Sequence, residues 1–291
     1  MSVVLTFAQP DFSTVEKVKE YLLHRPNYSE LGRLIDYDNA DTGCGFSVEF
    51  NSSPDSVDLE QSGPALGFLL NYNRPKPFIR EAIAEISAFN KVFPGPFYNE
   101  ETSQIEAFEA ERFLEGWSRA NDYFIRKLSK ESNWYQVFAP SAIVEKVWAW
   151  NAHRQTLQME VGDDLFVANV IWLKQDKSAA IPHILWADTV RTLFPDFIDC
   201  FALGTPKKVG WRPCNRRAEA ETEYRIVPGA TTYANATLEP ITIRGTRAYA
   251  TPINIPDSLL RAVRAIAPMQ SGADHFVHAS FVIEAEILQT A

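Results

Sequence analysis

Hydrophobic and polar residues follow two different periods along the chain, and each period predicts a different kind of element. At 45–50 apolar and polar residues alternate, as they do in a strand with one buried face. The stretch 65–72 is more continuously apolar, which suits a strand in the middle of a sheet. Together these patterns predict strands at 3–7, 45–50, 65–72, 165–173, 239–244, 247–253 and 276–288.

Apolar residues spaced three to four positions apart predict the helices. The longest expected helix covers about 103–129, with Phe113 and Trp117 on its buried side. The stretch 141–157 fits either a helix or a strand. Further helices are predicted between Ser13 and Pro26, at 78–89, on both sides of Pro195 within 182–201, and from Asp257 to about residue 266.

The order of the predicted elements indicates the fold class. Strands and helices are interleaved without the strict alternation that a parallel βαβ sheet requires. We therefore expect an α+β protein with mixed or antiparallel sheets and packed helices, arranged as two α/β subdomains. A chain of 291 residues is longer than one hydrophobic core usually supports. The predicted domains are an acidic 1–135 and a C-terminal 136–291, with the boundary anywhere in 130–160.

Negative charge is concentrated in the first half of the chain. Residues 1–140 contain 21 acidic and 13 basic side chains, a net charge of −8, while the whole chain carries −9. Such a surface repels nucleic-acid phosphates and attracts a basic partner. The clearest local clusters are a predicted acidic loop with Asp36, Asp38 and Asp41, and a predicted basic loop at 205–217.

Composition predicts a cytoplasmic protein. No stretch approaches the roughly 20 apolar residues that span a bilayer. The first ten residues contain no basic residue, and their apolar run is too short for a secretion signal. Cys44, Cys200 and Cys214 lie far apart and form no CxxC pair, so a reducing compartment without disulfides fits best.

The sequence lacks the common catalytic and metal-binding motifs. It has no GxSxG elbow, no GxxxxGK[ST] phosphate loop and no complete GxGxxG turn. An EF-hand loop beginning at Asp36 would lack its glycine and its final glutamate. His275 and His278 form an HxxH pair that leads into a predicted strand, where their rings would point to opposite faces. We therefore expect no enzyme activity, no cofactor and no metal ion.

Acidic residues are the candidate partner-binding residues. Six acids lie within 100–115, with Arg112 as the one basic residue among them. Acid–base catalysis would require a desolvated member, and this cluster has the composition of a solvated one. An electrostatic docking surface and an ordinary exposed helix face explain it equally well. The predicted docking residues are Asp36, Asp38, Asp41, Glu100, Glu101, Glu106, Glu109 and Glu111.

Three stretches resemble a known family. GFLLNYN at 67–73, FPGPFY at 93–98 and VIWL at 170–173 are similar to the bacterial immunity family numbered fifty-two, and the resemblance covers most of the chain. That family pairs with toxins of restriction-endonuclease type. The resemblance implies an immunity protein of a polymorphic-toxin or type VI secretion system, which binds a basic nuclease toxin one to one and blocks it. The alternatives are a hydrolase with a site assembled from scattered residues, such as His183 or the His275/His278 pair, and a phage or structural assembly protein.

Overall fold

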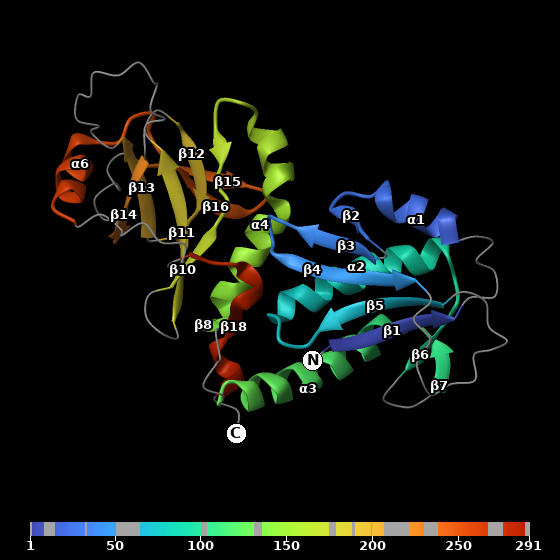
Figure 1. The fold of residues 1–291 in the computed structure, drawn as a ribbon. Coiled ribbons are helices and arrows are strands. Elements are labelled where there is room, and N and C mark those ends of the chain that lie inside the picture. Colours follow the sequence, from blue (N-terminus) through green and yellow to red (C-terminus); the bar gives the residue numbers. More distant parts are fainter. Residues whose placement is uncertain are drawn as a thin grey trace, which may run out of the picture. The chain divides into compact units, whose positions relative to one another are not determined.

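The chain folds into two units in the computed structural model, Met1–Val144 with His278–Ala291, and Glu145–Val277 (Figure 1). The structure describes residues 2–8, 15–32, 34–50, 65–99, 104–130, 136–174, 179–187, 190–198, 200–206, 222–229, 238–266 and 276–288. Helices pack against sheets that are mostly antiparallel or mixed, so the predicted α+β fold class is confirmed. The division into two domains within 130–160 stays a prediction. Over the described part of the chain, no helix is both long enough and apolar enough to cross a membrane.

A seven-stranded antiparallel sheet with the order β2-β3-β4-β5-β1-β6-β7 forms the first unit. Its strands are β1 (Ser2–Ala8), β2 (Tyr28–Leu31), β3 (Leu34–Asn39), β4 (Cys44–Phe50), β5 (Ala65–Asn71), β6 (Pro96–Asn99) and β7 (Gln104–Ala107). In the register, Val48 and Leu5 both stand opposite Phe68. All three side chains are at most 1 % exposed, so they mark the core face of the sheet.

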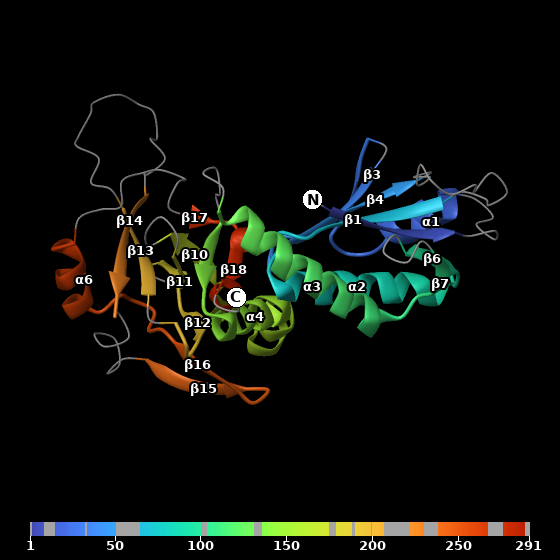
Figure 2. The same cartoon turned by 90° about the horizontal axis from the view of Figure 1, so that it is seen from below.

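Three helices contribute to the core on that face: α1 (Val15–Leu23), α2 (Lys76–Val92) and α3 (Ala110–Leu128). Figure 2 shows α2 and α3 on the same side of β1 and β4. The rings of Phe7, Phe68 and Phe89 meet at centroid distances of 5.4 to 5.8 Å. These contacts join β1, β5 and α2 into one hydrophobic core.

The segment near the C-terminus completes the first unit. Its elements are η2 (Ala279–Phe281), β18 (Val282–Glu284) and η3 (Ala285–Leu288), and β18 pairs in parallel with β8 (Val137–Ala139). Glu284 Oε1 accepts a hydrogen bond from the first backbone N–H of α2 at 2.8 Å. Glu286 accepts one at 2.9 Å from the first backbone N–H of α4 (Ser141–Val161). A carboxylate at a helix N-terminus is favourable because it satisfies N–H groups that the helix leaves unpaired.

Two smaller mixed sheets form the second unit. Their orders are β14-β13-β11-β10-β17 and β15-β16-β12-β9, with parallel pairing between β11 and β13 and between β12 and β9. The elements are β9 (Phe166–Val167), β10 (Ile171–Lys174), β11 (Ala180–Ala187), β12 (Thr192–Pro195), β13 (Cys200–Pro206), β14 (Thr222–Pro228), β15 (Glu239–Ile243), β16 (Thr246–Ala250), α6 (Asp257–Arg264) and β17 (Phe276–Val277).

Two predictions for the first unit are wrong. The acidic loop is strand β3, in which Ile35 and Tyr37 are buried and alternate with the two aspartates. This period of two was hidden by the charges between the apolar residues. The long helix begins at Ala110, because 104–107 forms β7.

Other predictions fail in the second unit. The stretch expected to be helical at 182–201 forms β11, β12 and the beginning of β13. Neighbouring residues His183 and Ile184 are both 0 % exposed, so both faces of β11 are buried. A strand buried on both faces is continuously apolar, and its pattern cannot be told from that of a buried helix.

The strand expected at 165–173 is divided into β9 and β10, which belong to different sheets. Side chains of α4 hold the residues between them. Trp150 Nε1 donates to the backbone oxygen of Ala168 at 2.8 Å. The Asn151 amide bonds both the N–H and the oxygen of Val170, at 3.0 and 2.8 Å. These bonds satisfy backbone groups that a continuous strand would have paired with its neighbours.

Most of the other expected strands and helices are present in the structure. The strands at 3–7, 45–50, 65–72, 239–244 and 247–253 are confirmed, as are the helices before Pro26, at 78–89 and from Asp257. The ambiguous stretch 141–157 is helical. The alternation at 276–288 is split between β17, β18 and two short 3-10 helices. Of the predicted basic loop, 207–217 lies outside the described residues.

Candidate functional site

The predicted docking residues that the structure describes fall into two groups. Asp36, Asp38 and Asp41 lie on β3 or in the turn after it, whereas Glu106, Glu109 and Glu111 lie on β7 or at the start of α3. Four strands, β4, β5, β1 and β6, separate β3 from β7 in the sheet order. Glu100 and Glu101 lie outside the described residues. The two groups therefore belong to opposite ends of the sheet.

At the β3 end, two glutamates of α2 accept hydrogen bonds from the protein's own side chains. Glu81 Oε1 is bonded by Tyr37, Asn39 and Thr42 at 2.7 to 3.1 Å, and Glu85 Oε2 by Arg25 and Tyr28 at 2.6 to 3.2 Å. We call this set the Glu81–Glu85 network. Burial, and then the charge of the nearest glutamate, raises the pKa of both tyrosines. The network ties β2, β3 and the following turn to α2, which is a structural role.

At the β7 end, a cavity of about 410 Å³ lies between β1, the β6–β7 hairpin and α3. Its lining includes Val3, Val4, Leu5, Tyr72, Phe97, Glu106, Glu109, Arg112, Phe113, Gly116, Trp117 and Arg119. We call it the β1–α3 cleft. Glu109, Arg112 and Arg119 are exposed, so the cleft opens to solvent on the side of α3.

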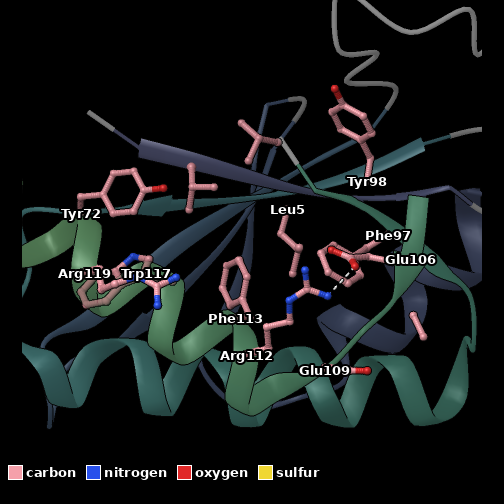
Figure 3. Close-up of a pocket in the computed structure, with 14 residues that line it drawn as sticks. Leu5, Tyr72, Phe97, Tyr98, Glu106, Glu109, Arg112, Phe113, Trp117 and Arg119 are labelled. Carbon is pink, nitrogen blue, oxygen red and sulfur yellow. Dashed lines mark hydrogen bonds and ion pairs between the residues drawn. The ribbon is translucent and has the colours of Figure 1, made fainter. Parts of the chain in front are cut away.

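The floor of the cleft is apolar and largely aromatic. Leu5, Phe97 and Phe113 point toward one another from β1, β6 and α3 (Figure 3). Leu5 and Phe97 are at most 4 % exposed, and Trp117 is 2 % exposed. The Trp117 indole N–H is buried and has no hydrogen-bond acceptor among the residues that the structure describes. Apart from this one donor, the interior of the cleft favours a large apolar group.

One wall of the cleft is a strand edge. β1 pairs with β5 along all seven residues, whereas within the part of the chain that the structure describes it pairs with β6 at Thr6 and Phe7. β6 then turns into β7, where Asn99 pairs with Gln104. No described strand pairs with residues 2–5 on the β6 side. In an antiparallel strand, alternate residues direct their N–H and C=O groups to each side, so this edge presents backbone groups that a further strand would bond.

Charges of both signs lie at the rim of the cleft. Arg112 donates a hydrogen bond to Glu106 Oε2 at 2.7 Å, drawn as a dashed line in Figure 3. Glu109 and Arg119 form no ion pair with any other described residue. They are ten positions apart, which is about 15 Å along a helix. The rim thus has an unpaired negative charge near the hairpin and an unpaired positive charge near Tyr72.

Gly116 also lines the cleft, one helical turn after Arg112. Glycine in a helix interior costs about 1 kcal/mol relative to alanine. Any other residue would place a side chain at this position of the wall. The glycine therefore keeps space in the cleft at a cost to the helix.

The histidines of the enzyme alternative have structural surroundings. His183 is 0 % exposed on β11, and burial lowers its pKa to about 4, which keeps the ring neutral at pH 7. His278 Nδ1 lies 2.8 Å from Ser280 Oγ and accepts the Ser280 backbone N–H at the start of η2. His275 lies outside the described residues. Within the described part of the chain, no three His, Cys, Asp or Glu side chains gather as a metal site.

A second cavity, of about 460 Å³, lies in the second unit and is lined by residues of α4 and of the β15–β16 hairpin. The Lys146 ammonium lies 5.8 Å from the centre of the Phe197 ring in its wall. Arg244, at the tip of the hairpin, pairs with Glu160. None of the predicted docking residues lines this cavity.

Sequence reasoning did not locate the cleft. Helical periodicity placed Phe113 and Trp117 on a buried face, and Gly116 within a strong helical pattern was the one local signal of an opening. Which strand faces that helix, and where that strand lacks a neighbour, depends on residues distant in the sequence.

In comparisons with known proteins, no family model, no curated protein and no solved structure matches this chain.

Proposed function

We propose that the protein is a cytoplasmic toxin inhibitor of the immunity-protein kind, which binds its target one to one and catalyses no reaction. The observation that carries the proposal is the composition of the β1–α3 cleft. Tyr and Arg are among the residues that provide most of the binding energy at protein interfaces, and Tyr72, Arg112 and Arg119 lie together here. An open cleft with such anchors and a charged rim is suited to another protein.

The charge of the chain supports a basic target. Glu106 and Glu109 line the cleft, and Glu111 follows on the exposed side of α3. Acidic rim residues accelerate association with a basic protein and repel nucleic acid. A nuclease toxin of a polymorphic-toxin or type VI secretion system presents a basic groove for phosphates, and that groove is the surface that an acidic inhibitor would block.

Expression of the neighbouring gene tests the proposal. The gene next to this one is expressed in a bacterial host alone, with this protein, and with an unrelated acidic protein of similar charge. We expect growth arrest by the neighbour alone, recovery only with this protein, and a one-to-one complex by light scattering after gel filtration. A neighbour that does not arrest growth, or whose toxicity this protein leaves unchanged, contradicts the proposal.

A further inference from the structure

We infer that the β1–α3 cleft receives an extended segment of a partner protein, which pairs with residues 2–5 of β1 as an additional antiparallel strand. That the partner is a toxin rests on the proposed function; the pairing itself rests on the geometry of the cleft. The expected occupant is a strand with a basic residue, an apolar residue two positions later and an acidic residue two positions after that.

The backbone of β1 supplies the first argument. Among the described residues, its pairing with β6 is at Thr6 and Phe7, whereas its pairing with β5 continues to Ser2. An edge with unpaired N–H and C=O groups is a template for another strand, and this mode of recognition provides affinity through main-chain hydrogen bonds. Every pairing in this sheet is antiparallel, so an antiparallel addition continues its pattern.

The apolar floor supplies the second argument. Alternate side chains of an added strand point to the same face of the sheet. On the core face, the central one would enter the cavity of about 410 Å³ beside Phe113 and Trp117. A large apolar or aromatic side chain fits there because aromatic rings pack favourably against one another. The side chain would fill space that Gly116 leaves open.

The two unpaired charges supply the third argument and fix the order of the motif. Figure 3 shows Arg119 on the side of Tyr72, and Glu109 on the side of Phe97. A strand antiparallel to β1 would begin near Phe97 and end near Tyr72, because Phe7 pairs with Phe97 and Ser2 pairs with the residue before Tyr72. The separation of about 15 Å along α3 matches four to five residues of strand at about 3.3 Å each. A basic residue therefore meets Glu109, and an acidic residue four positions later meets Arg119.

A selection experiment tests this pairing without knowledge of the natural partner. The probe is a displayed library of random ten-residue linear peptides, selected against the full-length chain. We expect enrichment of peptides with the order basic, any residue, apolar, any residue, acidic. Failure to enrich any peptide, or enrichment of a motif without this order of charges, overturns the inference.

Matched variants locate the binding site of an enriched peptide. Arg119→Glu should weaken binding at least tenfold, whereas Lys127→Glu makes the same change of charge on an exposed residue of α3 outside the cleft and should change binding less than twofold. Gly116→Trp fills the cleft and should also weaken binding at least tenfold. If circular dichroism shows that Gly116→Trp does not fold, the result with Arg119→Glu alone tests whether the peptide binds in the cleft. Equal binding to Arg119→Glu and to Lys127→Glu overturns the inference.

Methylation of the peptide backbone separates strand addition from binding by side chains alone. N-methylation at the alternate amides that face β1 should abolish binding, while methylation at the intervening amides should leave it. Indifference to methylation at every position would show a ligand held only by its side chains and overturns the pairing. Full protection of the amides of residues 2–5 from hydrogen exchange in the free chain would show an edge already occupied by the chain itself, with the same consequence.

The two proposals fail in distinguishable ways. If this protein does not rescue growth but the peptide results are as expected, the cleft binds a strand of a partner other than a toxin. The other outcome is that growth is rescued equally by the unchanged chain, by Arg119→Glu and by Gly116→Trp, with peptide binding unaffected by both substitutions. In that case the toxin binds elsewhere and the inference is wrong.

Discussion

The two ends of the seven-stranded sheet both carry acidic residues, but their charged groups have different partners. At the β3 end, Glu81 and Glu85 are bonded by five side chains of the same unit. At the β7 end, Arg112 pairs with Glu106, while Glu109 and Arg119 have no ion-pair partner among the described residues. Buried or half-buried charges that are matched internally stabilise the fold, whereas exposed unmatched charges contribute little to it. Exposed unmatched charges are therefore the ones available to a binding partner.

Replacement of a network glutamate has the largest expected effect on stability. Glu81→Leu leaves the donors of Tyr37, Asn39 and Thr42 without their acceptor, and should lower the free energy of unfolding by about 3 kcal/mol. Urea denaturation measures the change. Glu115→Leu, on the exposed surface of α3, is the control and should change stability by less than about 0.5 kcal/mol. Equal losses in the two variants would contradict a structural role for the network.

The tyrosine of the network gives a pH-dependent effect. Tyr37→Phe should lower the free energy of unfolding by about 1 kcal/mol at pH 7, because one hydrogen bond to a carboxylate is lost. The pKa of Tyr37 is raised in the folded state, so above pH of about 10 the unfolded chain loses the phenolic proton first. Wild-type stability should fall there, and the difference from Tyr37→Phe should shrink.

Urea denaturation at pH 7, 9 and 11 follows that difference. Tyr123→Phe, at a tyrosine that is 57 % exposed, is the control and should show no comparable change. A gap between wild type and Tyr37→Phe that stays constant up to pH 11 would show that Tyr37 does not remain protonated in the folded protein.

At the other end of the sheet, a substitution in the cleft should stabilise the protein. Gly116→Ala removes the conformational cost of glycine in a helix and places one methyl group in the cavity, so thermal denaturation should show a gain of about 0.5–1 kcal/mol. Ala120→Gly on the same helix should have the opposite effect. A loss of stability in Gly116→Ala would show that the wall of the cleft has no room for a Cβ.

At the rim of the cleft, the main expected effect is on association. Glu109→Lys with Glu111→Lys should lower the free energy of unfolding by about 0.5–1 kcal/mol, because both acids lie at the positive N-terminal end of α3. Stopped-flow measurements with the toxin should show slower association and a weaker dependence on salt, with little change in dissociation. Asp36→Lys with Asp38→Lys makes the same change at the β3 end. If that pair slows association equally, both ends of the sheet contribute to steering.

Local patterns were sufficient to predict the elements that bury one face. The alternation at 45–50 and the helical stripe at 78–89 survive in the structure because each element packs one side against the core and leaves the other polar. They were insufficient for β11, where both faces are buried, and for 165–173, where Trp150 and Asn151 replace a strand partner. At β3 the charged residues misled the prediction. Two aspartates on its other face made the stretch look like a loop and hid the alternation of the buried Ile35 and Tyr37.

The amino-acid sequence by itself determined the α+β class, the position of most strands and helices of the first unit, and the excess of acid in the first half, because each follows from local period or composition. Only the tertiary structure decided that Glu106 and Glu109 join Trp117 and Arg119 around one cleft while Asp36 lies at the other end of the sheet. The physical reason is that strand pairing joins residues far apart in the chain. The pairing of β1 with β6 at Thr6 and Phe7, and the position of α3 beside β1, are encoded by no single segment.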